Sequence, residues 1–371
     1  MALARRLLPV RRPAAPRPSQ AEWFGFDAPG ATREPFGDFE RLRRLGPVHF
    51  LPRHGCWIVL DHDDVKAALA QPELFSSEPQ REVDAILLGA DPPAHAAVRR
   101  LLTPYFTGAA LAGLNAGLRR EAEGLLRPRL DLVADYAIPL TRKLAAMLVG
   151  LEEGEVAAIL AADDLSAPAA AMSESSKDLL RRARIQGAIR AEAGDLLDEN
   201  AALSLVRLLC RAATETSERL IVRSAAALLD DEGVRCQIEA RPALLPRLVD
   251  EALRLWPPEP NVVRRATRDV PLGGTIMPAG ATLFLSLLAA NRDPRHFPDP
   301  RELRLDRLRS PHLAFSDGPH QCLGSGLGRR AAVTALEVLL DRSFRSAAGD
   351  RADETAVVQG IETPRRLAIA T

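Results

Sequence analysis

The segment from Ala201 to Leu229 constrains the fold more than any other part of this chain. It contains neither proline nor glycine. It keeps the apolar spacing of an α-helix for about 29 residues, which is longer than most helices of globular proteins. Its middle, residues 211–217, is unusually polar. The sequence therefore predicts one long helix that carries polar groups at its centre.

Helical patterns also dominate the rest of the chain, and the β-like runs are short. Val48–Leu51 and Cys56–Leu60 flank a glycine-containing turn and predict a hairpin. Two more strand-like runs, 262–266 and 282–285, follow a strongly helical segment, Leu245–Trp256. These patterns predict a mainly α fold with small β-sheets, organised as one domain over residues 21–371.

Charge and cysteine content exclude several classes of function. Lys and Arg total 49 and Asp and Glu total 49, so the net charge is zero and no global basic field attracts nucleic acid. The four cysteines form no CxxC pair, which argues against a zinc ribbon or a dithiol redox motif. Their wide spacing in a large chain favours reduced thiols and a cytoplasmic location.

The first 20 residues are rich in arginine and proline and are expected to form a disordered tail. Arg5 and Arg6 interrupt the apolar run Ala2–Val10, which makes it a poor signal-peptide core. No apolar run in the chain reaches the roughly 18 residues of a membrane span. A weak membrane-surface anchor is the alternative interpretation of this segment.

The loop Phe315–Gly324 carries the strongest chemical signal. It places Cys322 between glycines, directly before a predicted helix that runs to Leu340. Backbone N–H groups at the start of a helix stabilise a thiolate. Gly318 and Gly324 permit unusual dihedral angles and let a flat ligand approach the backbone. Considered alone, a cysteine in a glycine-containing loop is more often a small buried residue.

In full, the loop reads aromatic, small, any, Gly, any, basic, any, Cys, any, Gly. This pattern resembles the haem-binding loop of the cytochrome P-450 monooxygenases. The resemblance implies that Cys322 is the axial thiolate ligand of the haem iron and that His320 contacts a haem propionate. Ser316 stands where the family most often has glycine. Three further residues match the loop pattern and are implied to contact the cofactor: Phe315, Gly318 and Gly324.

A second segment, Glu251-Ala252-Leu253-Arg254, resembles the Glu-x-x-Arg motif of the same family. Residues at i and i+3 share a helix face, so Glu251 and Arg254 can pair. The implied role is structural, because the pair braces the core and the haem loop. The family often adds an arginine just before the loop, but Glu302 stands at that position here. Arg301 or Arg304 is the expected substitute.

The polar centre of the long helix, residues 212–217, resembles the oxygen-activation motif of this family. The resemblance implies that Glu215 and Thr216 are catalytic and deliver protons during oxygen activation. Ionisable and hydroxyl groups inside an otherwise apolar helix suit such a relay. Ala213 stands where the family usually has glycine beside the cofactor, and its methyl group is expected to narrow the oxygen pocket.

The segment from Asp91 to Arg100 resembles the family helix that binds a haem propionate. His95 and Arg99 lie at i and i+4, on one helix face, and two donors on one face suit a carboxylate. Arg264 matches another propionate ligand of the family. Arg265 competes for that role through a slip of one residue.

The resemblance implies the helical prism of this family, with a buried haem b between the long helix and the Cys322 helix. It implies a monooxygenase that inserts one atom of O2 into a small organic substrate, possibly a secondary metabolite. Electrons would come from NAD(P)H through a ferredoxin reductase and a ferredoxin. The basic residues expected to dock the ferredoxin are Arg100, Arg329 and Arg330.

Two other functions are compatible with the same loop. A haem-thiolate enzyme that uses peroxide, or that catalyses coupling or rearrangement, is compatible with Ala213 and with the short segment 152–202. Glu215 and Thr216 argue against it. A non-catalytic protein would bind haem without any turnover. The substrate stays open, including whether a carrier protein holds it.

Overall fold

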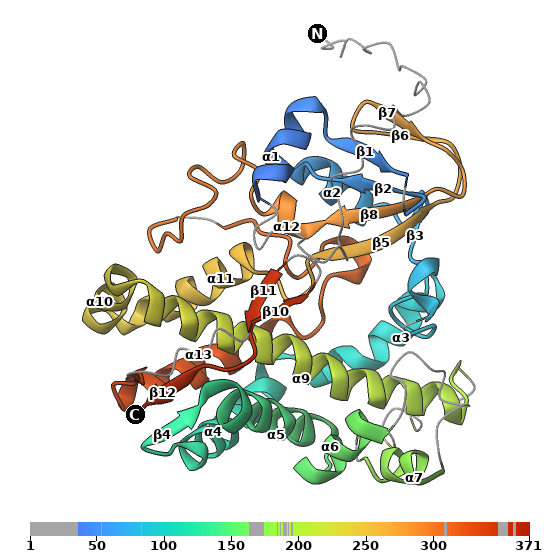
Figure 1. The fold of residues 1–371 in the computed structure, drawn as a ribbon. Helices are drawn as coiled ribbons and strands as arrows, with labels where there is room; N and C mark the ends of the chain where they lie inside the picture. The colour runs from blue at the N-terminus through green and yellow to red at the C-terminus, as the bar shows by residue number, and fades with distance from the viewer. Residues whose placement is uncertain are drawn as a thin grey trace.

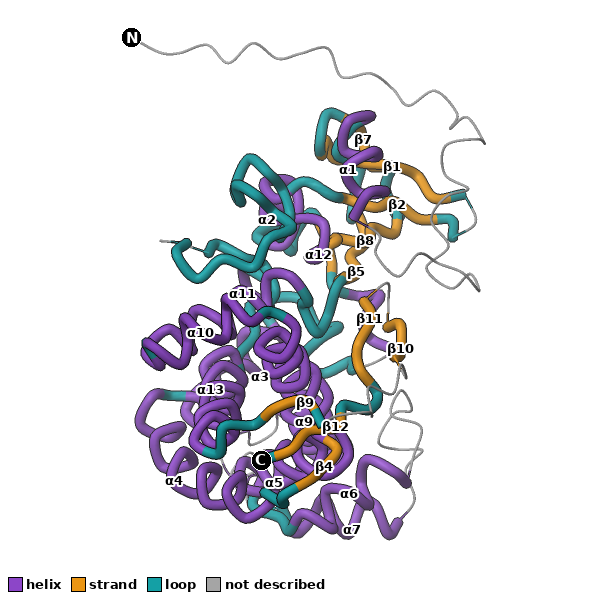
Figure 2. The backbone as a smooth tube through the Cα atoms, turned by 60° about the vertical axis from the view of Figure 1, so that its left-hand side comes forward, coloured by secondary structure: helices purple, strands orange, loops and turns teal. Residues whose placement is uncertain are grey.

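The computed structural model describes residues 36–371, except 53, 83, 163–173, 184, 186, 188–190, 192, 194–195, 308–309, 348–354 and 359–360. The expected N-terminal tail, residues 1–20, lies outside the described residues. Helices gather in one part of the molecule, and a small sheet with three short helices forms the other (Figure 1). The tube view separates the same two parts (Figure 2). This arrangement matches the predicted mainly α fold with small sheets.

The long central helix, α9, spans Glu199–Asp230 and agrees with the predicted segment to within two residues. The side chain of Asp198 caps its start by accepting a hydrogen bond from the N–H of Ala201. Around α9 pack α5, α11 and α13, and α4 lies against both α5 and α13. The bounds of the helices in this part are α3 (Ala94–Leu102), α4 (Gly108–Leu125), α5 (Ile138–Val149), α6 (Glu153–Ala162), α7 (Glu174–Arg182), α10 (Glu232–Ala240), α11 (Leu245–Leu255) and α13 (Ser325–Asp341).

The predicted hairpin is present as β1 and β2, paired antiparallel with Leu51 opposite Cys56. It belongs to a five-stranded sheet with the order β1-β2-β8-β5-β3, in which β2 and β8 run parallel. The short helices of this part are α1 (Phe36–Leu45), α2 (His62–Leu69) and α12 (Leu287–Ala290). The strands of the sheet are β1 (Val48–Leu51), β2 (Cys56–Val59), β3 (Phe75–Ser76), β5 (Asn261–Ala266) and β8 (Thr282–Ser286).

Three smaller sheets complete the described structure. One joins β4, β12 and β9, and the others are the pairs β6–β7 and β10–β11. Their bounds are β4 (Arg129–Asp131), β6 (Val270–Leu272), β7 (Thr275–Met277), β9 (Arg345–Ser346), β10 (Thr355–Val358), β11 (Ile361–Pro364) and β12 (Ala368–Ala370). Among the described helices, none is both long and apolar enough to cross a membrane.

Candidate functional site

Cys322 lies in the connection between a short 3-10 helix, Gly318–His320, and α13. The loop closes on itself because the Cys322 N–H donates to the carbonyl oxygen of Phe315 at 2.8 Å. Gly324 then caps α13, and the N–H of Gly328 donates to its carbonyl oxygen. The loop therefore holds the thiol at the start of a 17-residue helix, as the sequence predicts.

The structure gives different reasons for the presence of glycine at the two positions of the loop. Gly318 has φ +67°, and a Cβ there would lie 2.5 Å from the Leu69 carbonyl oxygen. Glycine is therefore required for the loop to pack on the end of α2. Gly324 has φ −83°, so the expected unusual dihedral angle is wrong at this position. A Cβ on Gly324 would still lie 4.0 Å from the sulfur of Cys322, on the side of the thiol.

Ser316, the residue that replaces the usual glycine, has φ +61° and a buried hydroxyl group without a hydrogen-bond partner. A left-handed conformation costs a non-glycine residue roughly 1–2 kcal/mol. We therefore expect Ser316→Gly to raise the free energy of unfolding by about 1 kcal/mol. This value is what is left when the larger conformational entropy that glycine loses on folding is subtracted. Ser204→Gly, inside α9, is the control and should lower it by a similar amount. Thermal unfolding of both variants tests this, and a less stable Ser316→Gly protein would contradict it.

The thiol of Cys322 is accessible and enclosed at the same time. Its residue is exposed. Yet burial by the surrounding protein raises the pKa of the thiol, while the N–H of Gly324 and the charges of Arg99 and Arg329 act to lower the pKa. Cys322 therefore still offers surface to a ligand although protein atoms surround its thiol. A positive metal ion on the sulfur would reverse the effect of burial and favour the thiolate.

Two histidines from distant parts of the sequence meet at the loop that carries Cys322. The rings of His95 and His320 lie 3.9 Å apart between centroids. Burial, and then the neighbouring His95, Arg264 and Arg99, lower the pKa of His320 to about 3. Burial and Arg99 also lower the pKa of His95. Four nitrogen groups that can be cationic thus crowd together, and each makes protonation of its neighbours harder.

This crowding is what an anionic ligand would relieve. Arg264 is 2% exposed, and burial lowers its pKa to about 10. Within the described part of the chain, no carboxylate oxygen lies within ion-pair distance of Arg99 or Arg264. A buried guanidinium normally has such a partner, because burial of an unpaired charge costs free energy. Arg264 donates only to the neighbouring Val263 carbonyl oxygen, at 2.8 Å. The donors beside the enclosed thiol therefore fit a flat group that carries carboxylates, as haem does.

The two neighbouring arginines of β5, Arg264 and Arg265, lie on opposite faces of the sheet. Arg265 points outward and pairs with Glu78 at 2.8 Å, with both side chains nearly half exposed. Arg264 points inward because successive side chains of β5 alternate between the two faces of the sheet.

The pairing of strands places β3 beside β5, with Ser76 opposite Arg265. Ser77 follows β3, and its hydroxyl lies 3.0 Å from Nε2 of His320, a contact that the sequence does not predict.

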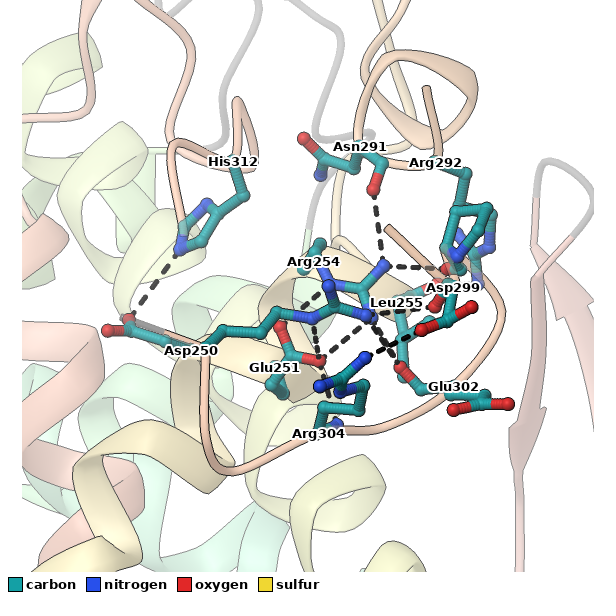
Figure 3. Close-up of polar contacts among 12 residues, drawn as sticks. Asp250, Glu251, Arg254, Leu255, Asn291, Arg292, Asp299, Glu302, Arg304 and His312 are labelled. Atoms are coloured by element: carbon teal, nitrogen blue, oxygen red, sulfur yellow. Dashed lines mark hydrogen bonds and ion pairs between the residues drawn. The ribbon is translucent and has the colours of Figure 1, made fainter. Parts of the chain in front are cut away.

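The Glu-x-x-Arg pair forms a buried bidentate ion pair on α11 (Figure 3). Nε and Nη2 of Arg254 donate to the two carboxylate oxygens of Glu251 at 2.7 and 2.8 Å. The guanidinium also donates to three carbonyl oxygens of the segment before the cysteine loop, those of Asn291, Pro300 and Glu302. Arg254 thereby fixes the path of a segment that has no regular secondary structure.

The third bracing residue is Arg307, which corrects the expectation from the sequence. Arg307 Nε donates to Glu251 Oε2 at 3.1 Å. Arg304 reaches Glu251 only through its backbone N–H, and its side chain pairs with two aspartates. Arg301 pairs with Glu40 on the surface. The bracing arginine therefore lies five residues after the position where the family pattern placed it.

The residues of the polar centre of α9 differ in burial. Ala213 is buried, whereas Glu215 and Thr216 are partly exposed on the helix. The hydroxyl of Thr216 donates to the carbonyl oxygen of Ala212 at 2.8 Å, one turn earlier. The helix remains regular throughout, so Ala213 does not interrupt the hydrogen-bond ladder of α9.

Comparisons with known proteins agree with this geometry. A family model described as Cytochrome P450 matches residues 228–354. Cytochrome P450 109 of Bacillus spizizenii is 30% identical over 83% of this chain and 84% of the relative. Cyclomarin C epoxidase CymV of Salinispora arenicola is 30% identical over 89% of this chain and 94% of the relative.

A solved structure extends the agreement to the fold. The crystal structure of CYP109E1 from Bacillus megaterium in complex with testosterone matches with a TM-score of 0.80 and 25% identity, over 91% of this chain and 97% of that chain. This match confirms the fold class that the sequence predicts. Taken with the identity to the two relatives over most of both chains, it shows that the chain belongs to the cytochrome P450 family of haem-iron monooxygenases.

Proposed function

We propose that the chain binds haem b through Cys322 and inserts one oxygen atom from O2 into a small organic substrate. The observation that carries this proposal is the thiol of Cys322 beside buried Arg264 and half-buried Arg99, which make no ion pair with a described carboxylate. Haem with a thiolate ligand supplies the activation of oxygen when it is bound. The protein supplies the ligand, the propionate donors and the route for protons.

The propionate donors come from three elements that the fold brings together. Arg264 lies on β5, and His320 belongs to the loop. His95 and Arg99 share one face of α3. Arginine and histidine at these positions provide charge-assisted hydrogen bonds to two carboxylates in a place shielded from water. Arg99 and Arg264 carry the positive charge in the free protein, and both add to burial in lowering the pKa of His320, so we expect the group to favour a dianionic cofactor.

Electron delivery is proposed to come from NAD(P)H through a ferredoxin reductase and a ferredoxin. An acidic partner needs free positive charge near the cysteine side of the protein. Arg100 is exposed on α3 and suits this role. Arg329 suits it less, because it pairs with Asp250 at 2.7 Å and lies over the ring of Phe315. For the substrate we propose a secondary metabolite, since one relative is named as an epoxidase of cyclomarin C.

Thr216→Ala tests the proposed proton route. We expect the fraction of consumed NAD(P)H recovered as product to fall by about tenfold or more, because the hydroxyl that passes a proton from Glu215 is lost. Hydrogen peroxide should appear instead. The measurement compares NAD(P)H consumption, peroxide release and product in one reaction with ferredoxin and its reductase.

Thr214→Ala is the matched control for this experiment. Thr214 lies two residues away and makes the same kind of backbone hydrogen bond, from its hydroxyl to the carbonyl oxygen of Cys210 at 3.0 Å. In Thr214→Ala, the fraction of consumed NAD(P)H recovered as product should equal that of the unmodified protein. If Thr216→Ala also recovers as much product per NAD(P)H as the unmodified protein, Thr216 is not part of the proton route. Peroxide-supported turnover as fast as the ferredoxin-supported reaction would favour a peroxide-using enzyme.

A further inference from the structure

A second cluster of metal-binding side chains lies at the start of α2. His62, Asp63 and His296 each offer one ligand atom, and these atoms all lie within 4.8 Å of one another. The two imidazole rings stack with centroids 4.1 Å apart. Asp63 Oδ1 lies 2.9 Å from His296 Nε2 and 3.8 Å from His62 Nδ1. The cluster joins α2 to the turn that follows α12.

The tautomer of His62 is set by its surroundings. Nε2 lies 2.9 Å from the carbonyl oxygen of Pro311. A carbonyl oxygen only accepts, so Nε2 carries the proton and Nδ1 of the neutral ring presents a lone pair. Metal-bound histidines usually donate their other ring N–H to a carbonyl or carboxylate in this way. The contact with Pro311 therefore prepares Nδ1 as a ligand.

Nδ1 of His62 is buried and has no hydrogen-bond partner. The residue is only 3% exposed, so water does not readily satisfy this nitrogen. A buried acceptor without a partner costs free energy and needs an explanation. A cation held between His62, Asp63 and His296 would satisfy it.

The charges around the cluster also favour a cation. Two guanidinium groups lie close by, but they pair with other carboxylates. Arg43 pairs with Asp61, and Arg295 pairs with both Asp61 and Asp293. The ion pairs that Asp63 makes among the described residues are with the two histidines. Its negative charge is therefore directed to the place where the lone pair of His62 points.

We propose that His62, Asp63 and His296 bind one divalent transition-metal ion, with Zn²⁺ as the best match. Imidazole nitrogen and carboxylate oxygen are ligands that Zn²⁺ prefers, and water can complete a tetrahedral site. Zinc bonds of about 2.0–2.2 Å require the three ligand atoms to approach one another slightly. The side chains of Asp63 and His296 are 66% and 28% exposed, so they can move, whereas buried His62 stays in place.

A metal here would tie α2 to the segment that Arg254 braces. The other end of α2 contacts the cysteine loop, since Gly318 packs on Leu69, and Lys66 lies 3.5 Å from Asp317. An ion that binds the folded protein alone stabilises the folded state by mass action. Zinc is therefore expected to raise the melting temperature of the protein. This proposal is independent of the proposed reaction.

The test uses the haem-loaded protein without a histidine tag, after treatment with a chelator that is then removed. Titration with ZnCl₂ followed by calorimetry should give one site per chain, and the melting temperature should rise with zinc concentration. His296→Gln and Asp63→Asn replace surface side chains and should fold normally. Each should weaken zinc binding by at least about tenfold and remove most of the thermal shift.

His54→Gln is the matched control, because His54 is an exposed histidine in the turn between β1 and β2. Its zinc affinity and thermal shift should equal those of the unmodified protein. The absence of a zinc-dependent thermal shift in the unmodified protein would overturn the proposal. So would unchanged zinc affinity in both His296→Gln and Asp63→Asn. Because zinc affinity is read without any turnover, a failed monooxygenase assay does not affect this test.

Discussion

Arg254→Ala is expected to lower the free energy of unfolding by about 3–5 kcal/mol, the usual cost of leaving one partner of a buried ion pair alone. Glu251, only 2% exposed, would lose its bidentate partner and keep only the contacts of Arg307 Nε and the Arg304 N–H to one of its oxygens. The carbonyl oxygen of Pro300 would lose its donor, and that of Glu302 would keep only the longer hydrogen bond from Arg307 Nη2 at 3.3 Å. We expect the Arg254→Ala variant to bind haem poorly, because the segment before the cysteine loop is no longer held in place. Denaturant unfolding with haem absorbance as a second signal measures both effects.

Arg304→Ala provides the control from the same segment. Its side chain pairs with Asp299 and Asp306 near the surface, and it contacts Glu251 only through the backbone. Surface ion pairs contribute roughly 0–1 kcal/mol, so this variant should be almost as stable as the unmodified protein. If Arg254→Ala yields no soluble protein, Arg254→Lys keeps the charge and should show a smaller loss. Equal stability of the Arg254 and Arg304 variants would contradict the bracing role.

Cys322→Ala is expected to reduce monooxygenase activity to background while leaving the fold intact. Cys322 is an exposed residue, so removal of its sulfur is expected to cost little stability. The thiolate is the ligand that favours cleavage of the O–O bond, and alanine cannot replace it. The absorption spectrum of any haem that still binds should lose the features of sulfur ligation.

Cys236→Ala is the matched control for that variant. Cys236 is an exposed cysteine on α10, with its sulfur 3.7 Å from Glu232, far along the chain from the loop. Its spectrum and activity should equal those of the unmodified protein. An unchanged haem spectrum in Cys322→Ala would show that another residue ligates the iron.

The parts that the sequence predicts well depend on residues close together in the chain. The period of apolar residues locates α9. In the structure Asp198 caps the start of α9, and Asp231, which follows its end, caps the start of α10. The loop around Cys322 is recognisable because its pattern occupies ten consecutive residues. The Glu251–Arg254 pair follows from the spacing of one helical turn.

The contacts that the sequence does not predict join segments without periodic pattern. Arg307 reaches Glu251 across 56 residues, and only the path of the irregular segment between them brings the two together. Ser77 and His320 are 243 residues apart and meet because β3 pairs with β5. The same holds for His62 and His296, whose stacking depends on α12 packing beside α2.

Gly318 shows that a sequence pattern can have more than one physical reason. It was expected to permit an unusual dihedral angle, which the structure confirms, and to make room for a flat ligand. In the structure its positive φ and its close approach to Leu69 already require glycine, whatever the ligand. A motif records which residue type fits a position, but only the three-dimensional neighbours reveal what excludes the alternatives.

The absorption spectrum of the reduced protein with carbon monoxide tests the central claim most directly. If Cys322 is the thiolate ligand of haem iron, the Soret band should shift strongly to longer wavelength. A band at the shorter wavelength typical of nitrogen-ligated haem would contradict the assignment of Cys322. The absence of any haem band, in protein produced with adequate haem, would contradict the proposed function as a whole.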